Sequence, residues 1–121
     1  MTQPLQKALR LPKDDYYRTH LALVNAMLPH DARMTEREMQ IIAKAMSFTG
    51  ELAEDRFGTS ARTIIKKELG LSDGGLGNFM KSMRSKGFII TNPNTGNEDI
   101  RPLFNVDPTE QLYTFKLIKL N

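Results

Sequence analysis

Basic side chains gather in one part of the 121-residue chain. Residues 60–91 carry six Lys or Arg against two Asp or Glu, whereas residues 1–59 carry eight of each kind and residues 92–121 carry three against four. Lysine and arginine bind phosphate groups through charge and hydrogen bonds. A local excess of +4 in a chain of net charge +3 is therefore typical of a surface that meets a polyanion, although solvated basic helix faces are also common.

The residue types that carry catalysis or hold metals are sparse. The chain has no cysteine, which excludes thiolate chemistry and disulfides. His20 and His30 stand ten residues apart and lack further ligands at metal-binding spacing. The glycines between Gly70 and Gly77 are not followed by the Lys-Ser/Thr pair that completes a nucleotide-binding loop. We therefore expect a protein that is not an enzyme and that uses neither a cofactor nor a metal.

Length and composition predict one globular domain. The chain is 40% hydrophobic and 26% charged, which is close to the globular average, and 121 residues suffice for a single core. No apolar run approaches the roughly 18 residues that a membrane span requires. We expect a cytoplasmic protein, in the host cytoplasm if it is encoded by a phage, with no membrane partner.

Two helices are expected ahead of the basic segment. Apolar residues recur every three or four positions over residues 14–28, as on one stripe of a helix. Thr35 and Glu38 form a Thr-x-x-Glu capping box, which predicts a second helix over residues 36–48. The pattern of residues 49–59 fits either one helical turn or a short strand.

Two further helices are expected inside the basic segment. Residues 60–69 have a helical apolar stripe that ends at Gly70, and Ser72 is a good cap for a second helix that Gly87 closes. Only Gly70 and Leu71 lie between the first helix and the cap of the second. A corner with so short a turn is the geometry of a helix-turn-helix.

The rest of the chain is predicted to form strands. Phe88–Thr91 is rich in strand formers, and the Asn, Pro and Gly of residues 92–99 predict a turn or loop. The tail at residues 112–120, LYTFKLIKL, predicts another strand. Its apolar residues on one face are Tyr113, Phe115 and Leu117.

Residues 60–91 resemble the helix-turn-helix and first wing strand of winged-helix DNA-binding proteins, such as the MarR-like regulators and related phage and plasmid proteins. In that pattern a hydrophobic residue precedes a serine cap, apolar residues follow at helical spacing, and a Lys-Gly-aromatic/aliphatic-Ile step ends the recognition helix. The residues that match in order are Leu71, Ser72, Leu76, Met80, Met83, Lys86, Gly87, Phe88 and Ile89.

The resemblance implies an α+β winged helix-turn-helix fold, with N-terminal helices followed by a C-terminal β wing. It extends loosely over residues 35–121. The implied parts of the single domain are an N-terminal extension at 1–13, helices in 14–48, the helix-turn-helix in 60–87 and wing strands in 88–120.

The resemblance also implies non-enzymatic binding of double-stranded DNA, in transcriptional regulation or replication initiation of a phage or mobile element. The recognition helix would enter the major groove, with neighbouring lysines and the wing on the backbone. The residues expected to contact DNA are Lys66, Lys67, Gly75, Gly77, Asn78, Lys81, Ser82, Arg84 and Lys86.

Two features leave an alternative open. Gly74, Gly75 and Gly77 crowd the start of the expected recognition helix, where a glycine costs about 1 kcal/mol relative to alanine. They permit close approach to a phosphate or to another protein backbone but weaken the case for rigid base-reading side chains. The charge excess is also small for a dedicated DNA binder. The alternative is a winged helix used as a protein adapter, or as a structural component of a virion or replication assembly.

A homodimer is expected through the N-terminal helices. Leu23 and Met27 lie beside the core stripe of the helix expected at residues 14–28, so its apolar arc is wider than one packing partner needs.

Overall fold

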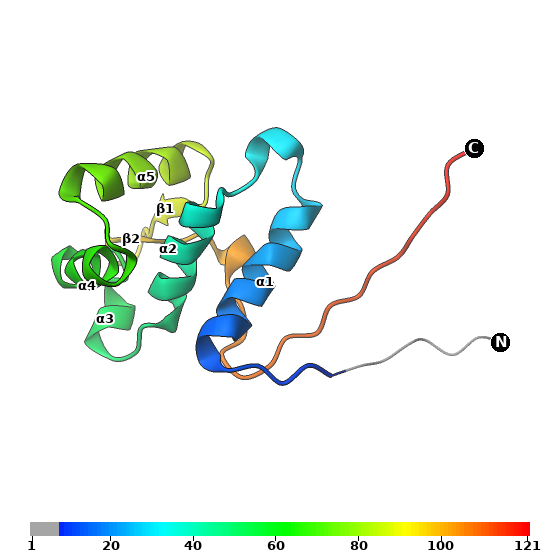
Figure 1. Ribbon diagram of the computed structural model, residues 1–121, viewed down its shortest axis with the longest axis horizontal. Helices are drawn as coiled ribbons and strands as arrows, with labels where there is room; N and C mark the ends of the chain where they lie inside the picture. Colours follow the sequence, from blue (N-terminus) through cyan, green and yellow to red (C-terminus); the bar gives the residue numbers. More distant parts are fainter. Residues whose placement is uncertain (1–7) are drawn as a thin grey trace.

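The computed structural model describes residues 8–121 (Figure 1). Within this range the chain forms five α-helices, two short 3-10 turns and one two-stranded antiparallel sheet. The elements in chain order are α1 (Lys13–Met27), α2 (Glu36–Ser47), α3 (Glu51–Glu54), α4 (Thr59–Leu69), α5 (Asp73–Ser85), β1 (Ile89–Thr91) and β2 (Glu98–Ile100). The α+β class expected from the sequence is confirmed. Of the predicted N-terminal extension, residues 1–7 lie outside the described part of the chain.

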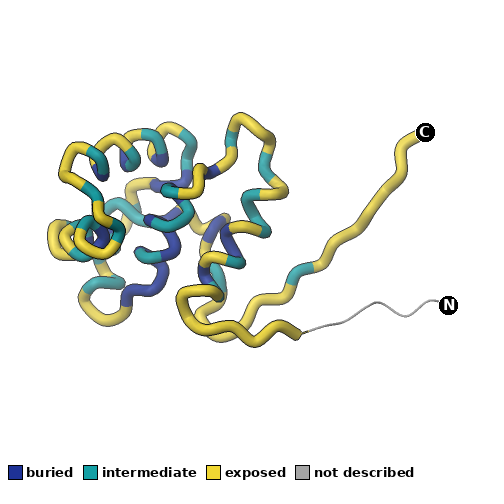
Figure 2. Tube along the Cα trace, in the orientation of Figure 1, coloured by how far each residue is buried: buried dark blue, intermediate teal, exposed yellow. Residues whose placement is uncertain are grey.

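Helix α2 lies at the centre of the fold, between α1 and the pair α4 and α5 (Figure 1). It begins with the predicted capping box, in which the Thr35 hydroxyl accepts from the Glu38 N–H and the Glu38 carboxylate accepts from the Thr35 N–H. Ile41 and Ile42 are fully buried. Because α2 contributes buried residues on several of its sides (Figure 2), it is the element around which the others pack.

The corner between α4 and α5 forms where the sequence predicts it. Gly70 has φ 65°, a left-handed conformation that favours glycine, and the Leu71 N–H donates to the Lys66 carbonyl at 2.9 Å. Ser72 caps α5 by accepting from the Gly75 N–H at 3.0 Å. The side chains that hold α5 in the core are Leu76, Met80 and Met83.

The sheet is a hairpin that follows α5 directly. Ile89 pairs with Ile100 and Thr91 with Glu98, and the Asn92 N–H donates to the Asn97 carbonyl at 2.7 Å to close the turn. Part of the segment that the sequence assigned to a loop, Glu98–Ile100, is therefore strand β2. The prediction was wrong there because Glu and Asp are poor strand formers by propensity, whereas pairing with β1 satisfies their backbone groups.

The C-terminal tail is not the predicted wing strand. Residues 105–121 contain no strand and lead away from the body of the molecule, and the tail is largely exposed (Figures 1 and 2). Leu117, expected on a packed face, is 99% exposed. Strand formers make a strand only when they pair with another backbone, and the tail adds no third strand to the two-stranded sheet.

Two contacts nevertheless tie the first part of the tail to α1, since the Tyr16 hydroxyl also donates to the Asp107 carbonyl at 2.7 Å. The Tyr113 hydroxyl makes a hydrogen bond with Nδ1 of His20, and Nε2 of the same ring bonds the Phe104 carbonyl at 2.9 Å. Burial lowers the pKa of His20, although the bond to the Phe104 carbonyl acts in the opposite direction. A neutral imidazole can donate to the carbonyl and accept from the tyrosine, so both contacts are satisfied without a charge.

Candidate nucleic-acid interface

Helix α5 has a buried face and an exposed face. Leu76 packs inward, whereas Asn78 and Lys81 are exposed as the sequence predicted. Since exposed positions recur at helical spacing, they form one continuous outward surface. The exposed residues from Gly74 onward are Gly74, Gly77, Asn78, Lys81, Arg84 and Ser85.

The glycines of α5 differ in whether their surroundings leave room for a side chain. A Cβ added at Gly74 or Gly77 would meet nothing within 4 Å, and neither residue has a positive φ. A Cβ at Gly75 would come within 3.0 Å of the Ser72 hydroxyl oxygen. The helix cap therefore accounts for Gly75, which the sequence assigned to DNA contact, whereas no packing within residues 8–121 requires glycine at positions 74 and 77.

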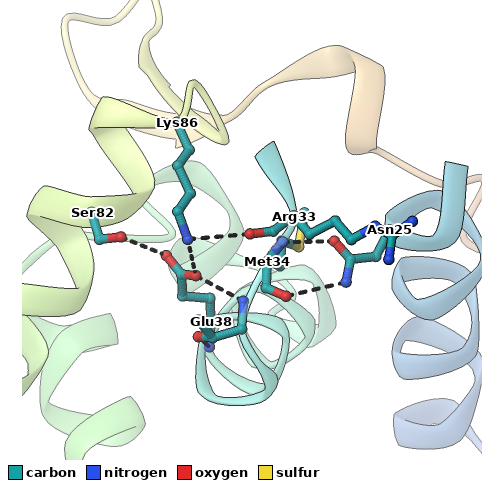
Figure 3. Close-up of polar contacts among 7 residues, drawn as sticks. Asn25, Arg33, Met34, Glu38, Ser82 and Lys86 are labelled. Atoms are coloured by element: carbon teal, nitrogen blue, oxygen red, sulfur yellow. Dashed lines mark hydrogen bonds and ion pairs between the residues drawn. The ribbon is translucent and has the colours of Figure 1, made fainter. Parts of the chain in front are cut away.

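Two residues predicted to face a partner turn inward instead (Figure 3). The Ser82 hydroxyl donates to the Glu38 carboxylate at 3.0 Å. The Lys86 ammonium donates to the same carboxylate at 2.7 Å and to the Arg33 carbonyl at 3.2 Å. The outward placement predicted for Ser82 and Lys86 is therefore wrong, because a carboxylate on α2 lies within reach of both.

Glu38 is a buried charge that joins α2 to the end of α5. The residue is 1% exposed. Burial alone would raise its pKa, but hydrogen bonds from Lys86, from the Thr35 N–H and from Ser82, together with the charge of Lys86, lower the pKa below its ordinary value. Glu38 is therefore ionised at neutral pH, and Lys86 supplies the opposite charge. We call Glu38, Ser82 and Lys86 the Glu38 node.

A second carboxylate ties the hairpin to the helices. Glu98 on β2 accepts from Nη2 of Arg84 at 2.7 Å and also contacts Nε of that guanidinium. Nη2 of Arg62 on α4 lies 3.1 Å from the same carboxylate. The bidentate bond from Arg84 lowers the pKa of Glu98, against the effect of burial. Arg84, predicted to contact DNA, is thus held by Glu98, one of the two acidic residues of β2.

The remaining lysines of the basic segment divide into two kinds. Lys66 is paired with Asp73, whereas Lys67 and Lys81 are exposed and have no carboxylate within 4.0 Å among residues 8–121. A further exposed cation that the sequence pattern did not indicate is Arg101, whose guanidinium lies beside Gly87, 3.4 Å from where a Cβ would be. In the sequence, Arg101 could have been noticed as the single basic residue in the acidic stretch that begins with the hairpin.

The free positive charge at this surface is therefore smaller than the sequence suggests. Lys86 is paired with Glu38, and Arg62 and Arg84 share Glu98, so two carboxylates from outside the basic segment offset two of these three charges. What remains outward on α4 and α5 is a lightly charged surface with few large side chains. We call the outward residues of α5 on this surface, Gly74, Gly77, Asn78 and Lys81, the α5 face; Lys67 on α4 is the other exposed lysine of the basic segment.

Within residues 8–121, no three His, Asp or Glu side chains are grouped so that they could hold a metal ion. No helix in the same range is both long and apolar enough to cross a membrane. Comparison with known proteins found no matching family, no similar curated protein and no similar solved structure.

Proposed function

We propose that the chain is a winged-helix domain that binds double-stranded DNA without catalysis. The observation that carries the proposal is the orientation of α5: three residues, 70–72, connect it to α4, its buried side packs on the core, and Asn78 and Lys81 are exposed. The hairpin β1–β2 follows α5 directly and serves as the wing. In this arrangement α5 enters the major groove, and the lysines contact phosphates.

The contacts of Glu98 support a wing that acts as a rigid body. Arg62 and Arg84 hold β2 against both helices of the corner. The turn of the hairpin, at residues 92–97, carries no charged side chain, and Glu98 directly after it is paired with Arg62 and Arg84. Such a domain suits transcriptional control or replication initiation in a phage or mobile element.

The test reverses the charge of the two lysines of the basic segment that have no carboxylate partner within residues 8–121. Lys67→Glu with Lys81→Glu is expected to weaken binding of a 20-bp duplex roughly 100-fold at about 50 mM salt, because two phosphate contacts are lost. The slope of log affinity against log salt is expected to be about −2 to −3 for the unchanged protein. In the variant the slope is expected to be shallower by about 2, so that it lies near zero. Fluorescence anisotropy with a labelled duplex measures both quantities.

The matched control reverses the charge of two lysines in the C-terminal tail. Lys116→Glu with Lys119→Glu alters the net charge by the same amount, but both residues are exposed on the segment that leads away from the body. The control is expected to keep most of the affinity. Equal losses in the two variants would show that the α5 face is not the interface.

Failure of the folded protein to shift any duplex at about 50 mM salt would instead favour the protein adapter. This second candidate is supported by the ion pairs that Arg62, Arg84 and Lys86 form with carboxylates. A partner protein, unlike DNA, needs little free positive charge on the α5 face.

We also propose that the protein is a homodimer through α1. Met27 is 70% exposed and Leu23 is half-buried, so α1 has apolar surface that its own core leaves uncovered. Two copies would present two α5 helices to one duplex. Light scattering at tens of micromolar is expected to give twice the monomer mass, and Met27→Glu is expected to reduce that mass. A monomer mass for the unchanged protein, with and without DNA, would contradict the proposal.

A further inference from the structure

We infer that this domain binds the sugar-phosphate backbone of duplex DNA with little regard to base sequence. The inference rests on the DNA binding proposed above. Base reading in the major groove needs side chains that reach out from the helix, and Gly74 and Gly77 of the α5 face have none. Their places are open, since a Cβ at either would meet no neighbour within 4 Å.

The side chains best suited to reading bases are already engaged. Arginine bound bidentately to guanine is the commonest specific contact, but Arg84 makes its bidentate contact with Glu98. Ser82 and Lys86, which have the donors that base edges accept, are bound to Glu38 instead. Reaching a base would require each of them to leave a carboxylate that holds the fold together.

Two side chains in the turn of the wing also make hydrogen bonds within the protein. The side-chain oxygen of Asn92 accepts from the Asn94 N–H at 2.9 Å, and the Thr95 hydroxyl accepts from the Asn97 N–H at 3.2 Å. The Asn92 side-chain oxygen and the Thr95 hydroxyl therefore stabilise the turn and are not free to contact a base. The side-chain amides of Asn94 and Asn97 make no hydrogen bond within residues 8–121, and in the proposed arrangement they meet phosphates as part of the wing.

Asn78 and Lys81 are the residues of the α5 face that remain for base contact. One bidentate contact to a base discriminates by roughly 5- to 150-fold, and a single lysine ammonium on a flexible stem discriminates less. Proteins that bind DNA specifically favour their sites by roughly 1,000-fold or more. Two such residues without further readers do not reach that ratio.

The experiment selects duplexes from a pool of randomised 20-bp DNA with the full-length protein. After several rounds, Kd for the selected DNA and for the unselected pool is measured by anisotropy at the same salt concentration. We expect the two Kd values to agree within about 30-fold, with equal salt slopes. A larger preference for the selected DNA would overturn the inference while leaving the proposed DNA binding intact. Absence of binding to either DNA would instead overturn the proposed function, and the inference with it.

The variant Asn78→Ala tests independently whether binding depends on base sequence. The variant is expected to weaken binding to selected and unselected DNA by the same factor, because the Asn78 amide meets the backbone in every complex. A loss confined to selected DNA would identify Asn78 as a base-reading residue and overturn the inference. Because Asn78 is exposed at the surface of α5, the substitution does not disturb the core.

Discussion

Replacement of Glu38 with alanine is expected to lower the free energy of unfolding by about 3–5 kcal/mol. The reason is that Glu38 accepts from Lys86, Ser82 and the Thr35 N–H at once, so its loss removes the charge partner of Lys86 and the capping box of α2 together. Urea denaturation followed by circular dichroism measures the change. The melting temperature should fall by on the order of 10–20 °C.

Ser82→Ala is the matched control for Glu38→Ala. It removes one hydrogen bond from the Glu38 node but leaves the ion pair and the capping box, so a loss of only about 1 kcal/mol is expected. A double variant, Glu38→Ala with Lys86→Ala, should be less destabilised than the sum of its single variants, because the two residues act on each other. A loss below about 1 kcal/mol in Glu38→Ala would contradict the role assigned to the node.

The stabilising effect of Glu38 is expected to depend on pH in a defined direction. Its pKa is lowered in the folded protein, so the unfolded chain takes up the proton first as pH falls. The contribution is therefore present above the ordinary glutamate pKa of 4.5 and is lost as pH falls below that value. Denaturation at pH 7 and at pH 3 should show the gap between the unchanged protein and Glu38→Ala shrinking at the lower pH.

Leu76→Ala is expected to lower the free energy of unfolding by about 2–5 kcal/mol. Leu76 is 2% exposed and belongs to the buried face of α5, so its truncation leaves a cavity where α5 meets the core. Lys81→Ala, on the exposed face of the same helix, is the control and should change the free energy by less than about 0.5 kcal/mol. Thermal melts of the two variants test the assignment of faces, and equal, small shifts would show that it is wrong.

These expectations draw on two kinds of information that the chain carries. The helices could be predicted because their signals lie within a few residues of one another. The capping box of Thr35 and Glu38, the Ser72 cap, and Gly70 at the end of α4 all act on neighbouring backbone groups. The division of α5 into Leu76 inward and Lys81 outward likewise follows from helical spacing.

The strands could not be predicted to the same degree. Residues 112–120 have the composition of a strand but no paired backbone, while Glu98–Ile100 lacks that composition and pairs with β1. A strand depends on a partner, and the partner is chosen by the turn and the packing of the helices rather than by the strand's own residues.

The sequence by itself therefore determined the helices, their caps and the inward face of α5, whereas the tertiary structure decided which charges remain free. The excess of positive charge in residues 60–91 is visible in the sequence, but its partners Glu38 and Glu98 lie outside that segment. A helix is specified by contacts a few residues apart, whereas an ion pair requires only proximity in space. The charge available to a DNA partner is thus a property of the folded molecule.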